Sequence, residues 1–257
     1  MSLTELAGGA LQVEADAIAR ITLNAPARRN AISQAMWRAL PAACAHVAEA
    51  RAVIVAGAEG HFSAGADISE FGSIYADEET ARTANAAVRA GQQALADLPC
   101  PVIAAVEGVC VGGGCGLALH ADLRIAGEGA RFAITPAKLG LAYSWEDTSR
   151  LVRTVGPAAA KDMLFSARTV AADEALRLGL VDRVVPAGQA EAGALAYAES
   201  LAALSPASLR VTKATVDAVA SGLGRRDDIA RAFETTFTGP DFAEGRSAFL
   251  EKRKPRF

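Results

Sequence analysis

Val106-Glu107-Gly108-Val109-Cys110-Val111-Gly112-Gly113-Gly114-Cys115-Gly116-Leu117 is the stretch that decides the fold class. The apolar run 102–106 predicts a buried strand, and a helix through His120 is expected after the glycines. In such a strand–turn–helix unit, free backbone N–H groups and the helix dipole can stabilise developing negative charge at one place. The alternative interpretation is that the glycines only allow a helix to pack closely on a strand. A dinucleotide fingerprint is not present, because reading from Gly112 gives G-x-G-x-x-L.

Strand-like and helix-like segments alternate on both sides of this unit. Ser33 can cap a helix to about residue 48, in which Pro41 indicates a kink or a break. Gly156-Pro157 is expected to end one element and start another. We expect further strands at 17–23, 52–56, 123–126, 131–134 and 181–185, helices at 78–98 and 171–178, and helical structure from 189 to about 252. The sequence therefore predicts a compact α/β core over residues 1–195 and a helical C-terminal region over 196–257.

Composition excludes several classes of protein. The 257 residues are 51% hydrophobic, which is too apolar for a disordered chain. With 26 Lys and Arg against 29 Asp and Glu, the net charge of −3 does not favour nucleic-acid binding. The apolar region 102–119 contains Glu107 and a glycine cluster, so it does not resemble a membrane span, and residues 1–10 show no signal-peptide pattern.

Cysteine and histidine usage indicates the compartment and the absence of a metal site. The four cysteines form no C-x-x-C pair, and the three histidines add no metal-ligand spacing. We expect free buried thiols, no metal, and a cytoplasmic location.

A second loop, His61-Phe62-Ser63-Ala64-Gly65-Ala66-Asp67-Ile68, follows the expected strand 52–56. Small residues let a backbone approach a ligand closely, and N–H groups exposed in such a turn can bind an anion. A plain tight turn is the alternative interpretation, and His61 is interpreted as a polar surface residue.

Together the two segments resemble the enoyl-CoA hydratase/isomerase (crotonase) superfamily, and the resemblance runs nearly end to end. Matching segments lie in the same order at 29–32, 63–68, 101–119, 121–126, 138–140, 150–151, 174–175, 179–181 and 248–255. It implies an α/β spiral of repeated β-β-α units, with a helical C-terminal region that assembles trimers, and hexamers built from two trimers. It also implies an acyl-CoA substrate, with coenzyme A present as part of the substrate and no separate cofactor.

The resemblance assigns the family's oxyanion hole to the backbone N–H groups of Ala66 and Gly113. Both would bond the thioester oxygen as it becomes an enolate oxygen. Family hydratases also use two glutamates, and the corresponding positions hold Gly116 and Pro136. Neither residue can transfer a proton, so the resemblance predicts that the rate of ordinary hydration is strongly reduced.

Three alternatives for the missing glutamates stay open. Thr135 to Tyr143 is similar to methylmalonyl-CoA decarboxylases, which would make Tyr143 an active-site residue, although Ala66 and Gly116 depart from that pattern. Glu146 or Asp147 could be a replacement acid or base, or could simply favour the start of a helix. The third alternative is a protein that binds CoA thioesters with little catalysis. Short-chain dehydrogenases and serine hydrolases are disfavoured, because Tyr-x-x-x-Lys and G-x-S-x-G are absent.

Substrate and CoA contacts are implied at several further positions. Trp145 could line the acyl pocket or be buried for packing alone. Basic residues of the loop and the tail could face CoA phosphates, or could be ordinary solvated charge. The residues expected to contact substrate or CoA are Arg28, Arg29, Ala31, Ala64, Asp67, Ile68, Gly112, Trp145, Phe249 and Lys252.

Overall fold

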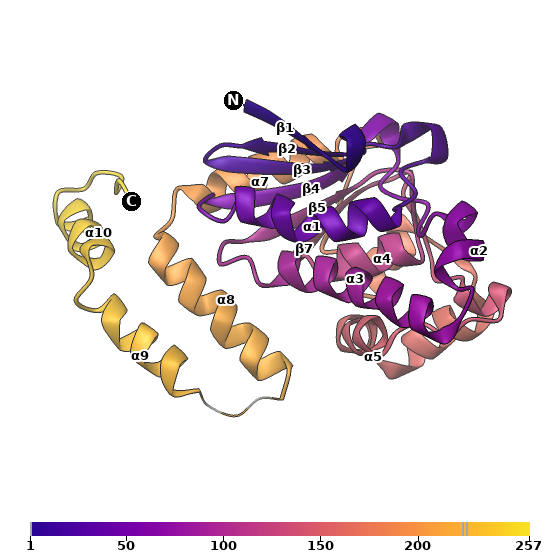
Figure 1. The fold of residues 1–257 in the computed structure, drawn as a ribbon. Coiled ribbons are helices and arrows are strands. Elements are labelled where there is room, and N and C mark those ends of the chain that lie inside the picture. The colour runs from indigo at the N-terminus through magenta and orange to yellow at the C-terminus, as the bar shows by residue number, and fades with distance from the viewer. Residues whose placement is uncertain (1, 223, 225) are drawn as a thin grey trace.

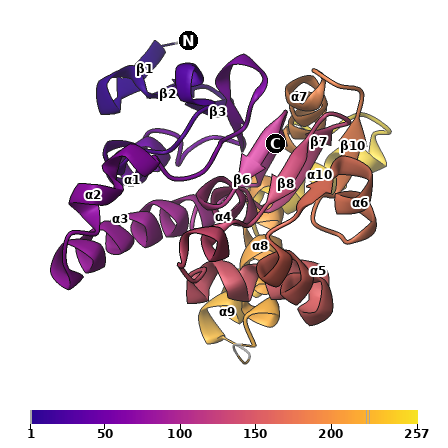
Figure 2. The ribbon, with the colours of Figure 1, turned by 90° about the vertical axis from the view of Figure 1, so that its right-hand side faces the viewer.

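The computed structural model describes residues 2–222, 224 and 226–257 of the chain. Its main sheet has seven strands in the order β1-β2-β3-β4-β5-β7-β10, and from β3 onward neighbouring strands are parallel. These strands are β1 (Ser2–Leu6), β2 (Leu11–Ala15), β3 (Ile18–Leu23), β4 (Ala52–Gly57), β5 (Val102–Val106), β7 (Leu123–Gly127) and β10 (Arg183–Val185). A smaller sheet holds β6 (Val109–Val111), β8 (Arg131–Ala133) and β9 (Thr169–Ala171). Figure 2 shows β6 and β8 next to the helix that follows β6.

The helices cover the sheets and continue beyond them (Figure 1). They are α1 (Gln34–His46), α2 (Phe71–Ile74), α3 (Glu78–Ala96), α4 (Gly113–Leu119), α5 (Trp145–Ser166), α6 (Ala172–Arg177), α7 (Ala190–Ala202), α8 (Pro206–Ala220), α9 (Asp227–Thr236) and α10 (Pro240–Leu250). This mixed architecture, with its helical C-terminal region, confirms the predicted fold class.

Alternation along the central strands builds a core on each face of the main sheet. In β4, Val53 and Val55 join the large core, whereas Ile54 lies in a second cluster together with alanines of α7. Successive side chains of a strand point to opposite faces, so a fully buried strand serves both cores. The sequence predicted buried strands at 52–56 and 102–106. These two strands, β4 and β5, contribute side chains to both cores and lie between them.

Pro41 does not break its helix, although the sequence predicted a kink or a break. Helix α1 runs through it from Gln34 to His46. Proline has no N–H for the carbonyl four residues earlier, which is that of Trp37. Helix α3 lies against this carbonyl, since a Cβ on Gly91 would be 2.9 Å from Trp37 O. The free carbonyl thus falls where two helices approach closely.

Other differences concern short elements. The strands β1, β2, β6 and β9 were not predicted, and each is only three to five residues long. The prediction at Gly156-Pro157 is confirmed: Gly156 has φ 77° and ψ 163°, which interrupts α5 between two helical runs.

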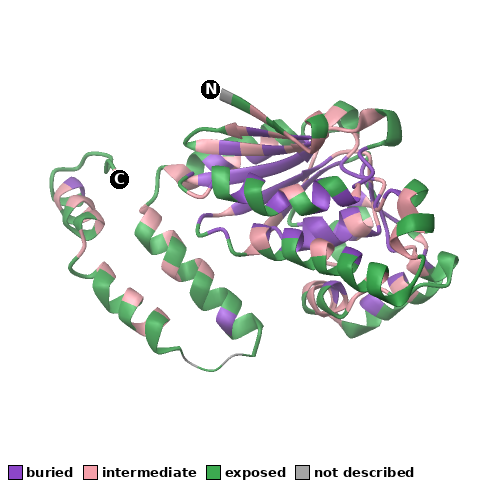
Figure 3. Cartoon of the chain, in the orientation of Figure 1, coloured by how far each residue is buried: buried purple, intermediate pink, exposed green. Residues whose placement is uncertain are grey.

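The C-terminal helices extend from one side of the core and are mostly exposed (Figure 3). Helix α8 is tied to the core by Lys213, whose Nζ lies 2.8 Å from Asp122 Oδ2 and donates to Cys100 O over 3.0 Å. The boundary expected after residue 195 falls inside α7. Because α7 packs on the sheet, we place the start of the C-terminal region after Ala202.

No helix within the described residues is long and apolar enough to cross a membrane. In the same residues, no three His, Cys, Asp or Glu side chains gather in a way that could hold a metal ion. All four cysteines are buried and unpaired.

Candidate active site

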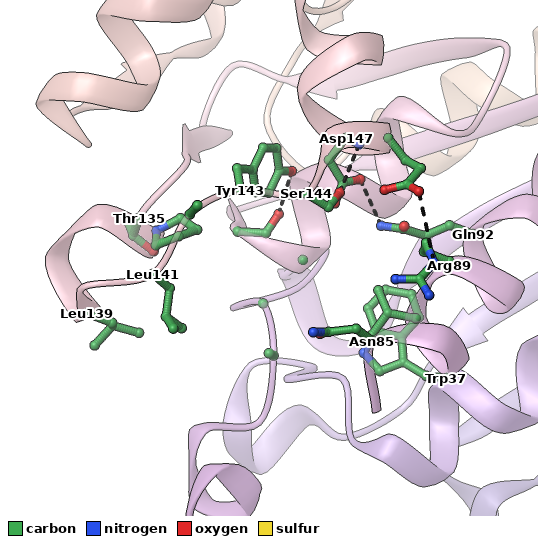
Figure 4. Close-up of a pocket in the computed structure, with 18 of the residues that line it drawn as sticks. Trp37, Asn85, Arg89, Gln92, Thr135, Leu139, Leu141, Tyr143, Ser144 and Asp147 are labelled. Atoms are coloured by element: carbon green, nitrogen blue, oxygen red, sulfur yellow. Dashed lines mark hydrogen bonds and ion pairs between the residues drawn. The ribbon is translucent and has the colours of Figure 1, made fainter. Parts of the chain in front are cut away.

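A cavity of about 380 Å³ lies where the loop after β4, the start of α4, helix α3 and the segment before α5 meet (Figure 4). Ala66 and Gly113 line one part of it. Gln92, Ser144 and Asp147 line another part. The two loops singled out in the sequence therefore share one cavity.

Backbone donors form the first part of this cavity. An ideal Cβ on Gly113 would lie 3.5 Å from the nitrogen of Ala66, so the two N–H groups are close neighbours. No hydrogen bond from either N–H occurs among the described residues. Gly113 is the first residue of α4, where an N–H has no partner within the helix. Gly112 precedes it with φ 51° and ψ −113°, a conformation that glycine permits. The arrangement suits an oxygen that gains negative charge.

Asn30 and Ser63 hold the loop that carries Ala66. The buried Asn30 has φ 58°, and its Nδ2 donates to Ala58 O over 2.8 Å and to His61 O over 2.6 Å. Ser63 Oγ donates to Asn30 O over 2.7 Å and accepts from Gly65 N over 3.1 Å. The loop is therefore fixed by buried side-chain bonds, which makes it more than a plain tight turn.

A buried carboxyl group forms the second part of the cavity. Asp147 is 4% exposed, and its Oδ1 accepts from Gln92 Nε2 over 2.9 Å. Its Oδ2 accepts from Ser144 Oγ over 2.8 Å, and Ser144 Oγ in turn caps α5 by accepting from Asp147 N over 3.0 Å. Burial raises the pKa of Asp147, whereas the hydrogen bonds from Ser144 and Gln92 lower it.

Gly116 leaves the space that this carboxyl group occupies. An ideal Cβ on Gly116 would lie 2.6 Å from Asp147 Oδ1 and 2.6 Å from Gln92 Nε2. Both distances are far shorter than a normal contact, so a side chain at position 116 would have to displace the end of the Asp147 or the Gln92 side chain. The acidic group of the cavity thus reaches it from α5 and not from α4.

Comparisons with known proteins agree with this geometry. The sequence model of the enoyl-CoA hydratase/isomerase family matches residues 14–257. The chain belongs to the enoyl-CoA hydratase/isomerase family.

Individual relatives support the assignment. An enoyl-CoA hydratase/isomerase family protein from Hyphomonas neptunium has a solved structure with TM-score 0.92, 43% identity, and coverage of 96% of this chain and 97% of its own. An enoyl-CoA hydratase/carnithine racemase from Magnetospirillum magneticum gives TM-score 0.92 at 34% identity, covering 96% and 95%. A short-chain-enoyl-CoA hydratase of Clostridium acetobutylicum is 35% identical, covering 92% of each chain. The protein is accordingly an enzyme of the family, and acyl-CoA is its class of substrate.

Tyr143 supports the glycine turn of this family member. Its hydroxyl donates to Gly112 O over 3.1 Å. Burial, followed by the charge of Asp147, raises the pKa of Tyr143 well above its usual value, so the phenol stays protonated. The tyrosine lines the cavity, with its hydroxyl committed to the backbone next to Gly113.

Glu146 and Trp145 lie at the exposed rim of the cavity. Glu146 is about half exposed, and its Oε1 is 3.9 Å from Nε of Arg89 on α3. Trp145 lines the cavity, but it is 82% exposed, so packing alone does not explain it.

The structure divides the remaining expected contacts into two groups. Ala64, Ile68 and Gly112 line the cavity. Six others are not part of its lining: Arg28, Arg29, Ala31, Asp67, Phe249 and Lys252. The buried Asp67 pairs with Arg28 and accepts from Ser69 N over 3.1 Å, so it holds the loop in place.

Several residues that line the cavity were not predicted from the sequence. Asn85, Arg89 and Gln92 line the cavity from α3 at the helical spacing i, i+4 and i+7. A polar stripe on the expected helix 78–98 would have been the available signal. His61, interpreted as a surface residue, is partly buried, and its Nδ1 accepts from Val109 N over 3.3 Å.

Proposed function

We propose that this enzyme moves a proton along the acyl chain of an acyl-CoA thioester, with Asp147 as the acid–base group. The backbone N–H groups of Ala66 and Gly113 would stabilise the enolate formed when the proton leaves. One observation carries the proposal: a buried carboxyl group with a raised pKa shares the cavity with these two donors. Shifting the double bond of an enoyl-CoA is the reaction that this geometry supports best.

A single carboxyl group is sufficient for that reaction. The ionised Asp147 removes a proton from the acyl chain, and the electron pair moves onto the thioester oxygen, where the two N–H groups bind it. The protonated Asp147 then returns the proton to another carbon, and the carbonyl forms again. Asp147 ends ionised, so no second acid or base is needed.

Hydration makes an additional demand on the site. A water molecule must lose a proton to a base, and the acyl chain must gain one from an acid. The two family positions for these glutamates correspond to Gly116 and Pro136, neither of which can transfer a proton. The space beside Gly116 is already filled by Asp147 and Gln92. This supports isomerisation over hydration, although the relatives named above include hydratases.

Turnover of a panel of CoA esters tests the proposal. We expect 3-enoyl-CoA esters to be converted to 2-enoyl-CoA faster than water is added to 2-enoyl-CoA. Asp147→Asn should lower kcat by about 10²- to 10⁴-fold, the usual contribution of a general acid–base group. Glu146→Gln, which changes the half-exposed neighbour, is the matched control and should retain far more activity than Asp147→Asn.

Other outcomes would favour the other candidates. Loss of CO₂ from malonyl-type esters would indicate a decarboxylase, and acyl-CoA binding without product from any ester would indicate a binding protein. Full activity of Asp147→Asn would contradict the assigned role of this residue.

We also propose assembly through the C-terminal helices into trimers, or hexamers of two trimers, in the cytoplasm. Support comes from large apolar side chains exposed on α8, α9 and α10 and at the residue that follows α9: Val216, Val219, Phe233, Phe237, Phe242, Phe249 and Leu250. Phe249 is 83% exposed, and together with Lys252 it would contact CoA across a subunit interface. Light scattering gives the mass in solution, and a monomer at micromolar concentration would contradict the proposal.

A further inference from the structure

Gln92 approaches Asp147 from α3, whereas Asp147 itself belongs to α5 (Figure 4). It is 1% exposed on α3, and its Nε2 donates to Asp147 Oδ1 over 2.9 Å. The neighbouring Gly91 lets α3 lie against α1, because a Cβ there would meet Trp37 O at 2.9 Å. The position of Gln92 is therefore set by close helix packing.

The other end of the Gln92 amide has an unused acceptor. Its Oε1 is buried, and no group in the described part of the chain donates to it. Buried polar atoms are normally hydrogen-bonded, so an orphaned acceptor beside a titratable group points to a functional use. An amide offers a donor at one end and an acceptor at the other.

We propose that Gln92 is a positioning residue that holds Asp147 in both of its protonation states by rotating its side-chain amide. With Asp147 ionised, Nε2 donates to the carboxylate, which is the arrangement of the amide in the structure. With Asp147 protonated, a half-turn of the amide brings Oε1 round to accept from the carboxylic acid. The carboxyl group then keeps its place while it takes up and returns a proton. The inference rests on the proposed role of Asp147 in proton transfer.

The other groups around Asp147 are not suited to this task. Those that face it are Glu146 and Arg150 on α5, His120 at the end of α4, Tyr143 in the preceding segment, and Arg89 on α3 beside Glu146. His120 Nδ1 lies 3.9 Å from Asp147 Oδ1 and contacts Gly116 O at 2.7 Å. Burial lowers the pKa of His120 to about 3, so its ring is neutral. Ser144 does bond the carboxyl group, but its oxygen also caps α5.

The pH dependence of kcat tests the inference with two variants and a control. Gln92→Leu removes both ends of the amide at similar size, and Gln92→Glu replaces the donor with a second carboxyl group. Gln92→Leu loses the hydrogen bonds to both forms of Asp147, and the bond to the ionised carboxylate is the stronger of the two. The pKa of Asp147 should therefore rise, and the acid limb of the profile should move to higher pH. In Gln92→Leu, we expect kcat at a pH on the acid limb to fall roughly tenfold more than kcat on the plateau. Gln92→Glu should move the acid limb to still higher pH, because a second carboxyl group disfavours the ionised form of Asp147. Gln93→Leu, an exposed neighbour on the same helix, should leave the limb in place.

A merely structural role for Gln92 would give a different result. Both variants would then lose activity by the same factor at every pH, with the limb unmoved, and this would overturn the inference.

Infrared difference spectroscopy without substrate separates this inference from the proposed function. The C=O band of protonated Asp147 is identified by its loss in Asp147→Asn. We expect it to persist to higher pH in Gln92→Leu than in wild type. Titration at the same pH in both proteins would overturn the role of Gln92, whatever the turnover. Full turnover by Asp147→Asn would instead contradict the proposed function.

Discussion

The two parts of the cavity are built in different ways. Ala66 and Gly113 contribute backbone N–H groups from two turns, and their side chains matter only through size. The carboxyl part depends on the side chains of Asp147 on α5, Gln92 on α3 and Ser144, the N-cap residue of α5. A backbone site tolerates changes of residue that keep the turn, whereas a side-chain site fails when one partner changes. This difference predicts how each part responds to substitution.

Of the effects that follow from this difference, the largest is expected from removing a backbone donor. Gly113→Pro eliminates the N–H at the first position of α4, where proline is compatible with a helix. Loss of one such donor should lower kcat by about 10²- to 10³-fold. Gly113→Ala retains the N–H and is the control. Steady-state kinetics of the two variants should therefore differ greatly. Similar kcat values would show that this N–H does not act on the substrate.

The next prediction concerns protein stability and tests whether the space beside Gly116 is filled. In Gly116→Ala the new Cβ would have to push Asp147 or Gln92 away, and such overpacking should lower the free energy of unfolding by about 1–3 kcal/mol. Urea denaturation measures the change. Gly129→Ala, whose Cβ would have nothing within 4 Å, should stay within about 0.5 kcal/mol of wild type. Equal stability of the two variants would mean that the space beside Gly116 is open.

A smaller effect is expected on the pH dependence of the melting temperature. Burial raises the pKa of Asp147 in the folded state above its unfolded value, so ionisation disfavours folding. This penalty is absent below the unfolded pKa and develops as pH rises through the folded pKa. Asp147→Asn should therefore gain in Tm relative to wild type as pH rises from the unfolded pKa through the folded pKa of Asp147. A Tm difference that stays constant or falls with pH would contradict the raised pKa.

The smallest effect is expected outside the cavity. Arg29 is exposed, and if it contacts a CoA phosphate, Arg29→Gln should raise KM by up to about fivefold at low ionic strength and less at high salt. The exposed Arg38 of α1 provides the control Arg38→Gln. An unchanged KM for Arg29→Gln at low salt would remove this residue from the CoA site.

The two segments of the backbone part could be located in the sequence, because small residues after buried strands leave a local signature. Their N–H groups at Ala66 and Gly113 were assigned only through the family resemblance. The glycine cluster and the loop 61–68 each follow a buried strand, and the structure brings them into one cavity. Long elements such as α3 were also predictable, since its apolar pattern and its end before Pro99 are local features.

The carboxyl part could not be predicted to the same extent. Gln92 and Asp147 are 55 positions apart, and their hydrogen bond depends on how α3 packs beside α5. The sequence offered Asp147 only as one of two acidic residues, and a helix start explained both equally well. Burial separates them: Asp147 is buried and bonded to Gln92, whereas Glu146 is half exposed.

The absent Cβ at Gly116 also limits how this site can change by single substitutions. A glutamate at position 116 would meet Asp147 and Gln92 in the same space, so it would have to displace the present pair. Removing Asp147 first would leave Gln92 without the carboxylate it donates to, and the cavity without its buried acid. Each single step therefore disturbs the hydrogen bond between Gln92 and Asp147. The effects of mutations at positions 92, 116 and 147 should be strongly non-additive, which makes one acid–base arrangement hard to exchange for the other.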